Sequence, residues 1–88
     1  MSQQVLPSDS MDKPALTKHD RVGALLRKLR LEAGLRQVDV AKRLRLPQSF
    51  VSKYENGERR LEFVEVAETC AALGVRLSEF VRRFEAGG

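Results

Sequence analysis

Four polar residues in a short segment of the chain are the best suited to contact another molecule. They are Gln48, Ser49, Ser52 and Lys53, at positions i, i+1, i+4 and i+5. At this spacing the side chains share one face of an α-helix, because residues four apart lie one turn above each other. Amide, hydroxyl and ammonium groups, with almost no carboxylate among them, can hydrogen-bond to base edges in the major groove of DNA. The segment therefore predicts a helix that contacts DNA bases.

Two short runs of apolar residues surround these side chains. The runs consist of Val38, Ala41 and Leu44, and then Val51 and Tyr54. The first run stops before residues 45–47, which include a proline, and the second stops at residues 56–57. Two helices of about two turns each, joined by a turn of three or four residues, form a helix-turn-helix.

The positive charge of the chain is concentrated around these two runs. The net charge is +4, and residues 21–60 alone contribute +7 from eleven basic and four acidic residues. Residues 1–20 have a net charge of −1 and residues 61–88 a net charge of −2. A basic segment is often only a solvated surface, but here it coincides with the helix-turn-helix pattern. We therefore interpret it as an electrostatic footprint for phosphates.

Few residues are available for other chemistry. Cys70 is the only cysteine and His19 the only histidine, which argues against an intrachain disulfide and a zinc site. No carboxylate pair, Ser–His arrangement or glycine-rich phosphate loop is present, so we expect neither an enzyme nor a cofactor, metal or small-molecule ligand. There is no apolar run of about eighteen residues and no apolar leader, so we expect a cytoplasmic, nucleoid-associated protein without a membrane span.

The apolar pattern predicts an all-α fold, a compact bundle of five helices. We expect helices over residues 20–33, 36–44, 47–56, 62–73 and 77–85. A disordered arm is expected at residues 1–18, the DNA-binding domain at 19–86 and a frayed end at 87–88. Asp20 is the predicted N-cap of the first helix.

The helical period also predicts which side chains face inward. The inward residues are Val22, Leu26, Leu29 and Ala33 in the first helix, with Leu25 beside this stripe, and Phe63, Val66, Ala67, Cys70 and Leu73 in the fourth. Cys70 is thus expected to be a core residue and not a reactive thiol. Phe50 either packs beside Tyr54 or touches a thymine methyl, and the preference of aromatic residues for cores favours packing.

The helix-turn-helix segment resembles the phage-repressor-type family of bacterial and phage regulators, also called Cro-like or XRE-type. The resemblance covers about residues 20–81 and is carried by Gln37, Ala41, Leu44, Val51, Ser52 and the triplet Glu55-Asn56-Gly57. It implies the five-helix bundle of the lambda-repressor-like DNA-binding domain. It also implies binding to double-stranded operator DNA, mostly as twofold dimers.

The resemblance assigns roles to individual residues. Base contacts fall to Gln48, Ser49, Ser52 and Lys53, and phosphate contacts to Arg36, Gln37, Asn56, Arg59 and Arg60. Arg30 and Glu55 match a buried ion pair between the first and third helices, the alternative being two solvated charges. Three residues depart from the family pattern: Arg36 and Pro47 replace the usual Ser or Thr caps, and Arg45 replaces a frequent glycine.

The function expected from these observations is a transcription regulator, a repressor that binds an inverted-repeat operator as a homodimer. Val81 and Phe84 are the candidates for the dimer interface; the alternative is that they close the core of their own domain. The second functional hypothesis is an antitoxin or bridging module of the same fold, which pairs with a toxin or another protein partner. The charge of the DNA-facing segment indicates that such a role would add to DNA binding and not replace it.

Overall fold

The computed structural model describes residues 17–87 of the chain, and these form five α-helices without a strand. The helices are α1 (Lys18–Glu32), α2 (Gln37–Leu44), α3 (Gln48–Glu55), α4 (Phe63–Leu73) and α5 (Leu77–Glu85). The predicted all-α five-helix fold is therefore confirmed. Most of the predicted arm, residues 1–16, and the final residue of the predicted frayed end lie outside the described residues.

Helix α1 begins earlier than predicted, and its N-cap is Thr17 and not Asp20. The Thr17 hydroxyl accepts a hydrogen bond from the Asp20 N–H at 3.0 Å, and the Asp20 carboxylate accepts one from the Thr17 N–H at 3.3 Å. This reciprocal arrangement is a capping box, in which the acidic residue occupies the third helical position. The sequence analysis predicted Asp20 as the N-cap, whereas Asp20 is the third helical residue of the capping box and Thr17 is the N-cap.

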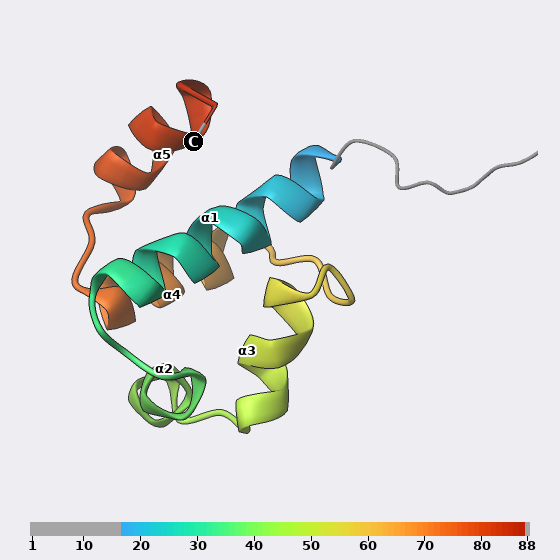
Figure 1. The fold of residues 1–88 in the computed structure, drawn as a ribbon, viewed down its shortest axis with the longest axis vertical. Coiled ribbons are helices and arrows are strands. Elements are labelled where there is room, and N and C mark those ends of the chain that lie inside the picture. The colour runs from blue at the N-terminus through green and yellow to red at the C-terminus, as the bar shows by residue number, and fades with distance from the viewer. Residues whose placement is uncertain (1–16, 88) are drawn as a thin grey trace, which may run out of the picture.

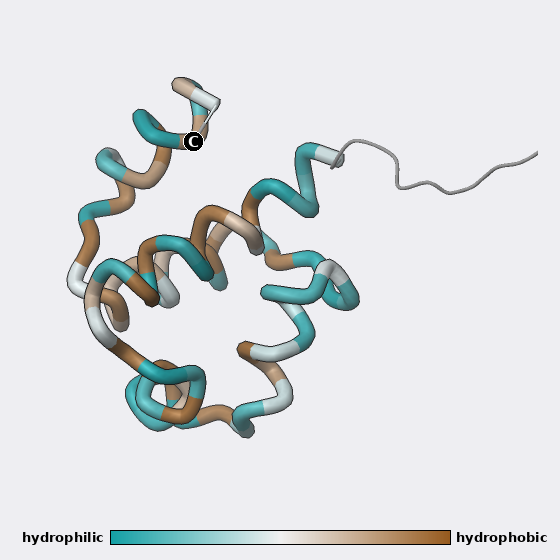
Figure 2. The backbone as a smooth tube through the Cα atoms, viewed as in Figure 1, coloured by the Kyte–Doolittle hydropathy of each residue, from teal (hydrophilic) through white to brown (hydrophobic). Residues whose placement is uncertain are grey.

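The five helices enclose one small core, to which every helix contributes. Helix α1 packs against α3, α4 and α5, while α2 packs against α3 and α4 (Figure 1). Hydrophobic and hydrophilic residues alternate along α1, as expected for a helix with one buried side (Figure 2). The buried apolar residues are Leu25, Leu26, Leu29, Val40, Ala41, Val51, Tyr54, Val66, Cys70, Leu73 and Phe80.

Gly23 allows α1 and α3 to cross at very short distance. A Cβ atom at this position would lie only 2.0 Å from the carbonyl oxygen of Tyr54. Since this neighbour is a backbone atom, any larger residue would force the two helices apart. The position of the predicted DNA-contacting helix thus depends on a glycine in another helix, which was not among the predicted site residues. An isolated glycine inside a helical pattern often marks a close packing contact, and this feature of the sequence could have predicted the role of Gly23.

Two residues predicted to face inward are exposed. Phe63 is 70% exposed, although it lies on the same apolar stripe as Val66 and Cys70. It is the first residue of α4, where no neighbouring helix covers it, and helical periodicity cannot reveal this. Ala33 is exposed because it is the C-cap of α1 and lies beyond the packed part of that helix.

Two other predictions about the core are confirmed. Cys70 is completely buried, and burial raises the pKa of its thiol to about 11, so it remains protonated at neutral pH. The ring of Phe50 packs against the core edge-to-face with Tyr54, at a centroid distance of 5.6 Å.

Candidate nucleic-acid interface

Helix α3 has a polar outer side and an apolar inner side. Gln48, Ser49 and Lys53 are exposed and Ser52 is partly buried. On the opposite side Val51 is fully buried, and α3 is fixed to the core there. The four polar residues of the predicted base-contacting set therefore come together on the free side of one short helix.

A buried ion pair joins the end of α3 to α1. The Arg30 guanidinium donates two hydrogen bonds to the Glu55 carboxylate, from Nε to Oε2 at 2.7 Å and from Nη2 to Oε1 at 3.0 Å. The Glu55 side chain is only 1% exposed and that of Arg30 9%. The hydrogen bond to Glu55 raises the pKa of Arg30, although burial acts in the opposite direction. A third guanidinium hydrogen bond, from Nη1 to the Leu35 carbonyl oxygen at 2.9 Å, holds the α1–α2 connection.

The same carboxylate is linked through Gln37 to Gln48. The Gln37 amide nitrogen donates to Glu55 Oε1 at 3.0 Å, and the Gln48 amide nitrogen donates to Gln37 Oε1 at 3.3 Å. The chain of contacts therefore runs from the buried ion pair to an exposed side chain at the start of α3. Gln37, predicted to bind a phosphate, lies next to a predicted base-contacting residue and hydrogen-bonds to it.

The direction of this chain follows from the chemistry of Glu55. An ionised carboxylate only accepts hydrogen bonds, so the Gln37 amide must turn its NH₂ group toward Glu55. Its carbonyl oxygen then faces Gln48, which must in turn present its own NH₂ group. The carbonyl oxygen and one N–H of Gln48 remain for an external partner. The Arg30–Glu55 ion pair thus orients the Gln48 amide through Gln37.

Two of the three predicted phosphate-binding arginines already donate hydrogen bonds to a carboxylate. Arg36 is the N-cap of α2, and its guanidinium donates to both oxygens of Asp39 at 3.0 and 2.9 Å. The Asp39 carboxylate also accepts the Arg36 backbone N–H at 2.8 Å. The hydrogen bonds from the Arg36 side chain and backbone lower the pKa of Asp39 to about 2. Arg36 therefore has a local partner, and Asp39 supplies only the N3 half of a capping box, because no side chain caps the first turn of α2.

Arg59 is held in a similar way, on the far side of α3. Its guanidinium donates to the two oxygens of Glu65 at 3.0 and 2.9 Å and lies 4.8 Å above the ring centroid of Phe50. Arg60 is exposed beside it. Asn56 is the C-cap of α3, and its amide is 3.4 Å from the Ser52 hydroxyl. A phosphate would have to compete with Glu65 for Arg59 and with the Ser52 hydroxyl for one N–H of Asn56.

Arg27 is a cation near this site that was not among the predicted contacts. Its Nε lies 4.0 Å from Glu55 Oε1, the same oxygen that accepts from Gln37, and the side chain is 58% exposed. That distance is too long for a hydrogen bond, so the guanidinium stays available to a phosphate. Arg27 precedes Arg30 by three residues, so the two side chains lie on the same face of α1.

The turn between α2 and α3 contains a strained residue. Arg45 is the C-cap of α2 with φ 59° and ψ 41°, the left-handed conformation that favours glycine. Pro47 is the N-cap residue of α3, and its side chain makes no capping hydrogen bond. Both residues are exposed next to Gln48. The left-handed turn thus places a cation three residues before the start of α3.

A family model described as "Helix-turn-helix domain" matches residues 21–84 of this chain. The chain belongs to this helix-turn-helix family. A solved structure titled as an XRE-family like protein from Pseudomonas syringae pv. tomato str. DC3000 is 39% identical, with 78% of this chain and 84% of that chain covered and a TM-score of 0.73. The protein is a helix-turn-helix DNA-binding regulator of the XRE type, and the predicted resemblance is confirmed.

Two further solved structures share the fold of this XRE-type protein. A single-residue mutant of the restriction-modification controller protein C.Esp1396I is 25% identical, with 82% of this chain and 91% of that chain covered and a TM-score of 0.77. The same controller protein, as a tetramer in complex with its natural 35 base-pair operator, is 24% identical, with coverages of 82% and 95% and a TM-score of 0.76. No curated protein matches the sequence.

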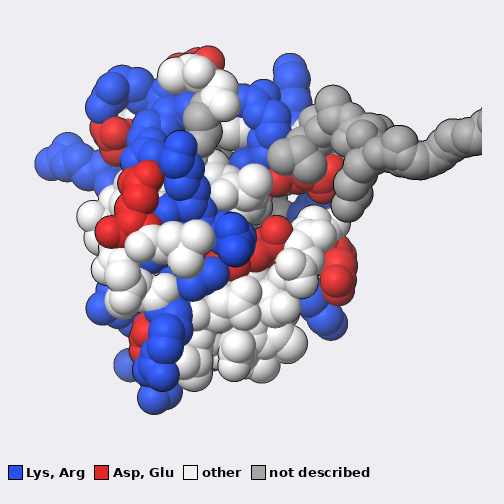
Figure 3. Space-filling view, in the orientation of Figure 1, with Lys and Arg blue, Asp and Glu red and all other residues white. Residues whose placement is uncertain are grey.

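Charge is unevenly distributed over the helix-turn-helix protein. Lys and Arg side chains cover much of the face in Figure 3, with an uncharged area where α3 lies and basic side chains where α2 lies. Among residues 17–87, no group of three His, Cys, Asp or Glu residues could hold a metal ion. In the same part of the chain, no helix is both long and apolar enough to cross a membrane.

The two candidates for the dimer interface differ in exposure. Val81 is 41% exposed, whereas Phe84 is partly buried between Phe80 and Arg21. The Phe80 and Phe84 rings stack at a centroid distance of 6.2 Å, and the Arg21 guanidinium lies 4.5 Å above the Phe84 ring. Arg21 also donates to the Phe84 carbonyl oxygen at 2.8 Å. Phe84 thus contributes to attaching α5 to α1.

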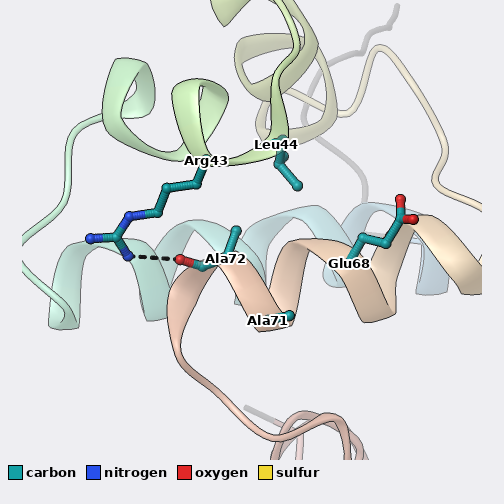
Figure 4. Close-up of a pocket in the computed structure, with 5 residues that line it drawn as sticks. All are labelled: Arg43, Leu44, Glu68, Ala71 and Ala72. Carbon is teal, nitrogen blue, oxygen red and sulfur yellow. Dashed lines mark hydrogen bonds between the residues drawn. The ribbon is translucent and has the colours of Figure 1, made fainter.

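A hollow of about 450 Å³ lies between α2 and α4 of the XRE-type protein. Its lining includes Leu44, Glu68 and Ala71 (Figure 4). Across it, Arg43 Nη1 donates to the carbonyl oxygen of Ala72 at 2.8 Å, at the C-terminal end of α4. A cation at this end stabilises a helix because the last carbonyl groups have no partner within it. This contact helps attach the helix-turn-helix to the rest of the domain.

Proposed function

We propose that this XRE-type regulator is a repressor that binds an inverted-repeat operator as a homodimer, with α3 in the major groove. The observation that carries the proposal is the outer side of α3, where Gln48 is oriented by hydrogen bonds from the buried ion pair. An amide with one free acceptor and one free donor matches a base edge that offers the complementary pair. Ser49, Ser52 and Lys53 complete the surface that contacts bases.

Phosphate contacts would fix the position of α3 in the groove. The N-terminal end of α2 carries Arg36 and Gln37 and favours an anion through its free N–H groups. Arg27 lies next to Gln37, and both approach Glu55 Oε1. Asn56, Arg59 and Arg60 follow α3 and would hold the backbone on the other side of the groove. These contacts raise affinity without reading sequence.

The small size of this surface supports a homodimer. One short helix contacts only a few base pairs, so a second copy related by a twofold axis is needed to read a full operator. The two recognition helices would lie about 34 Å apart, one turn of DNA. Occupation of such a site over a promoter would block transcription.

The base-reading role is tested by Gln48→Ala. Bound sites are selected from random duplexes with the wild-type protein, and affinities of the variant are then measured on the selected site and on single-base variants of it. We expect a loss of about 1–3 kcal/mol and relaxed preference at one base position per half-site. Ser78→Ala, an exposed change on α5, is the control. Equal losses on all duplexes would contradict direct readout.

The phosphate contacts are tested by the salt dependence of DNA binding. Arg27→Gln should lower the slope of log K against log salt by about one ion per protomer, because one guanidinium–phosphate contact is lost. Arg59→Ala should reduce the slope by one ion at most, since Glu65 already neutralises part of its charge. Arg76→Gln, an exposed change at the start of α5, should leave the slope unaltered. A wild-type slope in Arg27→Gln would remove this residue from the interface.

A further inference from the structure

We infer that Lys42 and Arg45, at the C-terminal end of α2, bind phosphates of the DNA backbone on the outer side of each half-site. The inference rests on the proposed function, because it adds a contact to the same DNA complex. Neither residue belongs to the phosphate contacts proposed above, which lie on α1, at the start of α2 and in the segment that follows α3.

Three cations end α2, and they differ in what they contact. Lys42 and Arg43 lie in the last turn, Arg45 is the C-cap, and all three are exposed. The Arg43 guanidinium faces α4, where it donates to the Ala72 carbonyl oxygen at 2.8 Å (Figure 4). Within residues 17–87, by contrast, no carboxylate forms an ion pair with Lys42 or Arg45. These two cations are therefore available to an anion from outside the protein.

The backbone of Arg45 has a conformation that favours glycine. Its φ of 59° is the only positive φ of a residue other than glycine in the described part of the chain. The Arg45 N–H donates to the Lys42 carbonyl oxygen at 3.1 Å, and a glycine would make the same bond without the steric cost of a side chain. An unfavourable backbone conformation of this kind is most often found at functional sites. The position of this side chain thus points to a contact outside the fold.

The turn after α2 brings both cations beside the start of α3. Arg45 precedes Gln48, the first residue of α3, by three residues. The Gln48 amide also donates to Gln37 Oε1 at 3.3 Å, so the start of α3 is joined to both ends of α2. A helix is about 10–12 Å across with its side chains, close to the roughly 12 Å width of the major groove. Cations that flank a helix in this groove therefore meet the phosphate backbone that borders it.

The homodimer of the proposed function would turn this end of α2 away from the twofold axis. Its interface candidates, Val81 and Phe84, line an apolar groove of about 200 Å³ between α1, α4 and α5, with the mostly exposed Phe63 in the same lining. No residue of this groove belongs to α2 or α3, and α2 lies at the opposite end of the molecule from α5 (Figure 1). Phosphates bound by Lys42 and Arg45 would therefore lie on the outer side of the half-site.

Cations at the C-terminal end of a helix also stabilise that helix through its dipole, and this role needs no DNA. The two roles are separated by what a neutral substitution changes. Loss of a dipole contact lowers the free energy of unfolding and leaves the salt dependence of DNA binding as it was. Loss of a phosphate contact lowers the slope of log K against log salt, because fewer counterions are released.

Lys42→Gln and Arg45→Gln test the inference through this slope, measured on one selected duplex. Each variant should lower the slope by about one ion per protomer, and the double variant by about two. Arg43→Gln is the matched control, because it removes an equal charge between the two positions from a guanidinium that faces α4. It should keep the wild-type slope. Preference among bases should be the same in all of these variants, since phosphate contacts do not read sequence.

Arg45→Gly provides a second variant that keeps the turn intact, because glycine favours the left-handed conformation. It should lower the slope as Arg45→Gln does, and circular dichroism should show that each protein is folded. A wild-type slope in Lys42→Gln, Arg45→Gln or Arg45→Gly, or an equal loss in Arg43→Gln, would each overturn the inference.

Neutral methylphosphonate linkages, each replacing one phosphate of the selected duplex, locate the contact. At one position on the outer side of each half-site, the linkage should weaken binding of the wild type by about tenfold. The same linkage should weaken Arg45→Gln by less than about twofold, because the variant has already lost the contact. Coupling of this kind only at linkages between the two half-sites, or at no linkage, would contradict the inference.

The outcomes separate this inference from the proposed function. If the wild type binds all duplexes with equal affinity but Lys42→Gln and Arg45→Gln lower the slope, the proposed function fails and the phosphate contact stands. If the wild type selects an inverted repeat and both variants keep its slope, the phosphate contact fails and the proposed function stands.

Discussion

The α2–α3 side of this protein and its α1–α4–α5 side present opposite chemistry to a partner. On the first side, amide and hydroxyl groups are exposed, and Gln48 is oriented through Gln37 by a carboxylate that is 1% exposed. On the second side, Phe63 and the groove next to it offer only apolar surface. Hydrogen bonds are directional and weaken quickly with misalignment, whereas apolar contacts are not directional. A surface of hydrogen-bonding groups therefore needs buried support to hold those groups in place, and an apolar surface does not.

The two sides also differ in what holds them to the rest of the domain. Helix α3 is attached by the ion pair of Arg30 and Glu55 and by the close crossing at Gly23. Helix α5 is attached to α1 through two arginines. Arg83 of α5 donates to the carboxylate of Glu32 in α1 at 3.0 and 2.9 Å, and Arg21 of α1 stacks on the Phe84 ring of α5. The support of α3 is buried, while the Arg83 pair is partly exposed. Substitutions should therefore destabilise the α3 side more strongly.

The largest effect is expected for Glu55→Ala, which removes the support of the α2–α3 side. It leaves the Arg30 guanidinium buried without its partner and should lower the free energy of unfolding by about 3–5 kcal/mol. Urea denaturation measures this, with Glu68→Ala on exposed α4 surface as the control. A loss below about 1 kcal/mol would show that the ion pair contributes no more than a surface pair.

Gly23→Ala should have the next largest effect, because it separates α3 from α1 without altering any polar group. The added Cβ would lie 2.0 Å from the Tyr54 carbonyl oxygen, so a helix must shift. We expect a loss of about 2–3 kcal/mol in the free energy of unfolding. Ala24→Gly, at an exposed position of the same helix, should lose only about 1 kcal/mol. If Gly23→Ala unfolds at the wild-type urea concentration, the close crossing does not limit the position of α3.

Arg45→Gly should stabilise the protein slightly, by up to about 1 kcal/mol. The left-handed conformation of Arg45 is unfavourable for a residue with a side chain, but glycine loses more backbone entropy on folding, so the two effects partly offset each other. If the cation lies near DNA, the same substitution should weaken binding to all duplexes alike. Thermal unfolding and DNA binding measured on one sample would separate the two effects. A destabilised variant would show that the Arg45 side chain contributes to the fold.

The smallest effect concerns acid stability at the start of α2. Because the folded pKa of Asp39 is about 2 and its usual value is 3.8, the folded state favours the ionised carboxylate. Its contribution is therefore fully present above about pH 4 and is lost as the pH falls toward about 2. Asp39→Asn should lose stability less steeply than the wild type over this range in urea denaturation, while Glu68→Gln should follow the wild type. Parallel curves for Asp39→Asn and the wild type would contradict the role of Arg36.

Local pattern alone was enough for much of this protein. The helical period of the apolar residues, together with glycine and proline positions, determined five helices and the helix-turn-helix. The spacing of Gln48, Ser49, Ser52 and Lys53 determined that they share one side of α3. The apolar stripe of α4 likewise determined that Cys70 is buried. These properties depend on residues within a few positions of one another, which is the range that sequence periodicity describes.

Only the tertiary structure decided which faces are covered and which polar groups meet. Periodicity placed Phe63 on the same stripe as Val66, but whether a neighbour covers the first turn of α4 depends on where α1 and α5 end. The link from Glu55 to Gln37 and Gln48 joins residues 18 and 11 positions apart, and it exists only because α2 and α3 are held at one distance. Gly23 sets the position of α3 against α1 from 31 residues before Tyr54. Such contacts depend on the crossing of whole helices, and no local spacing encodes that geometry.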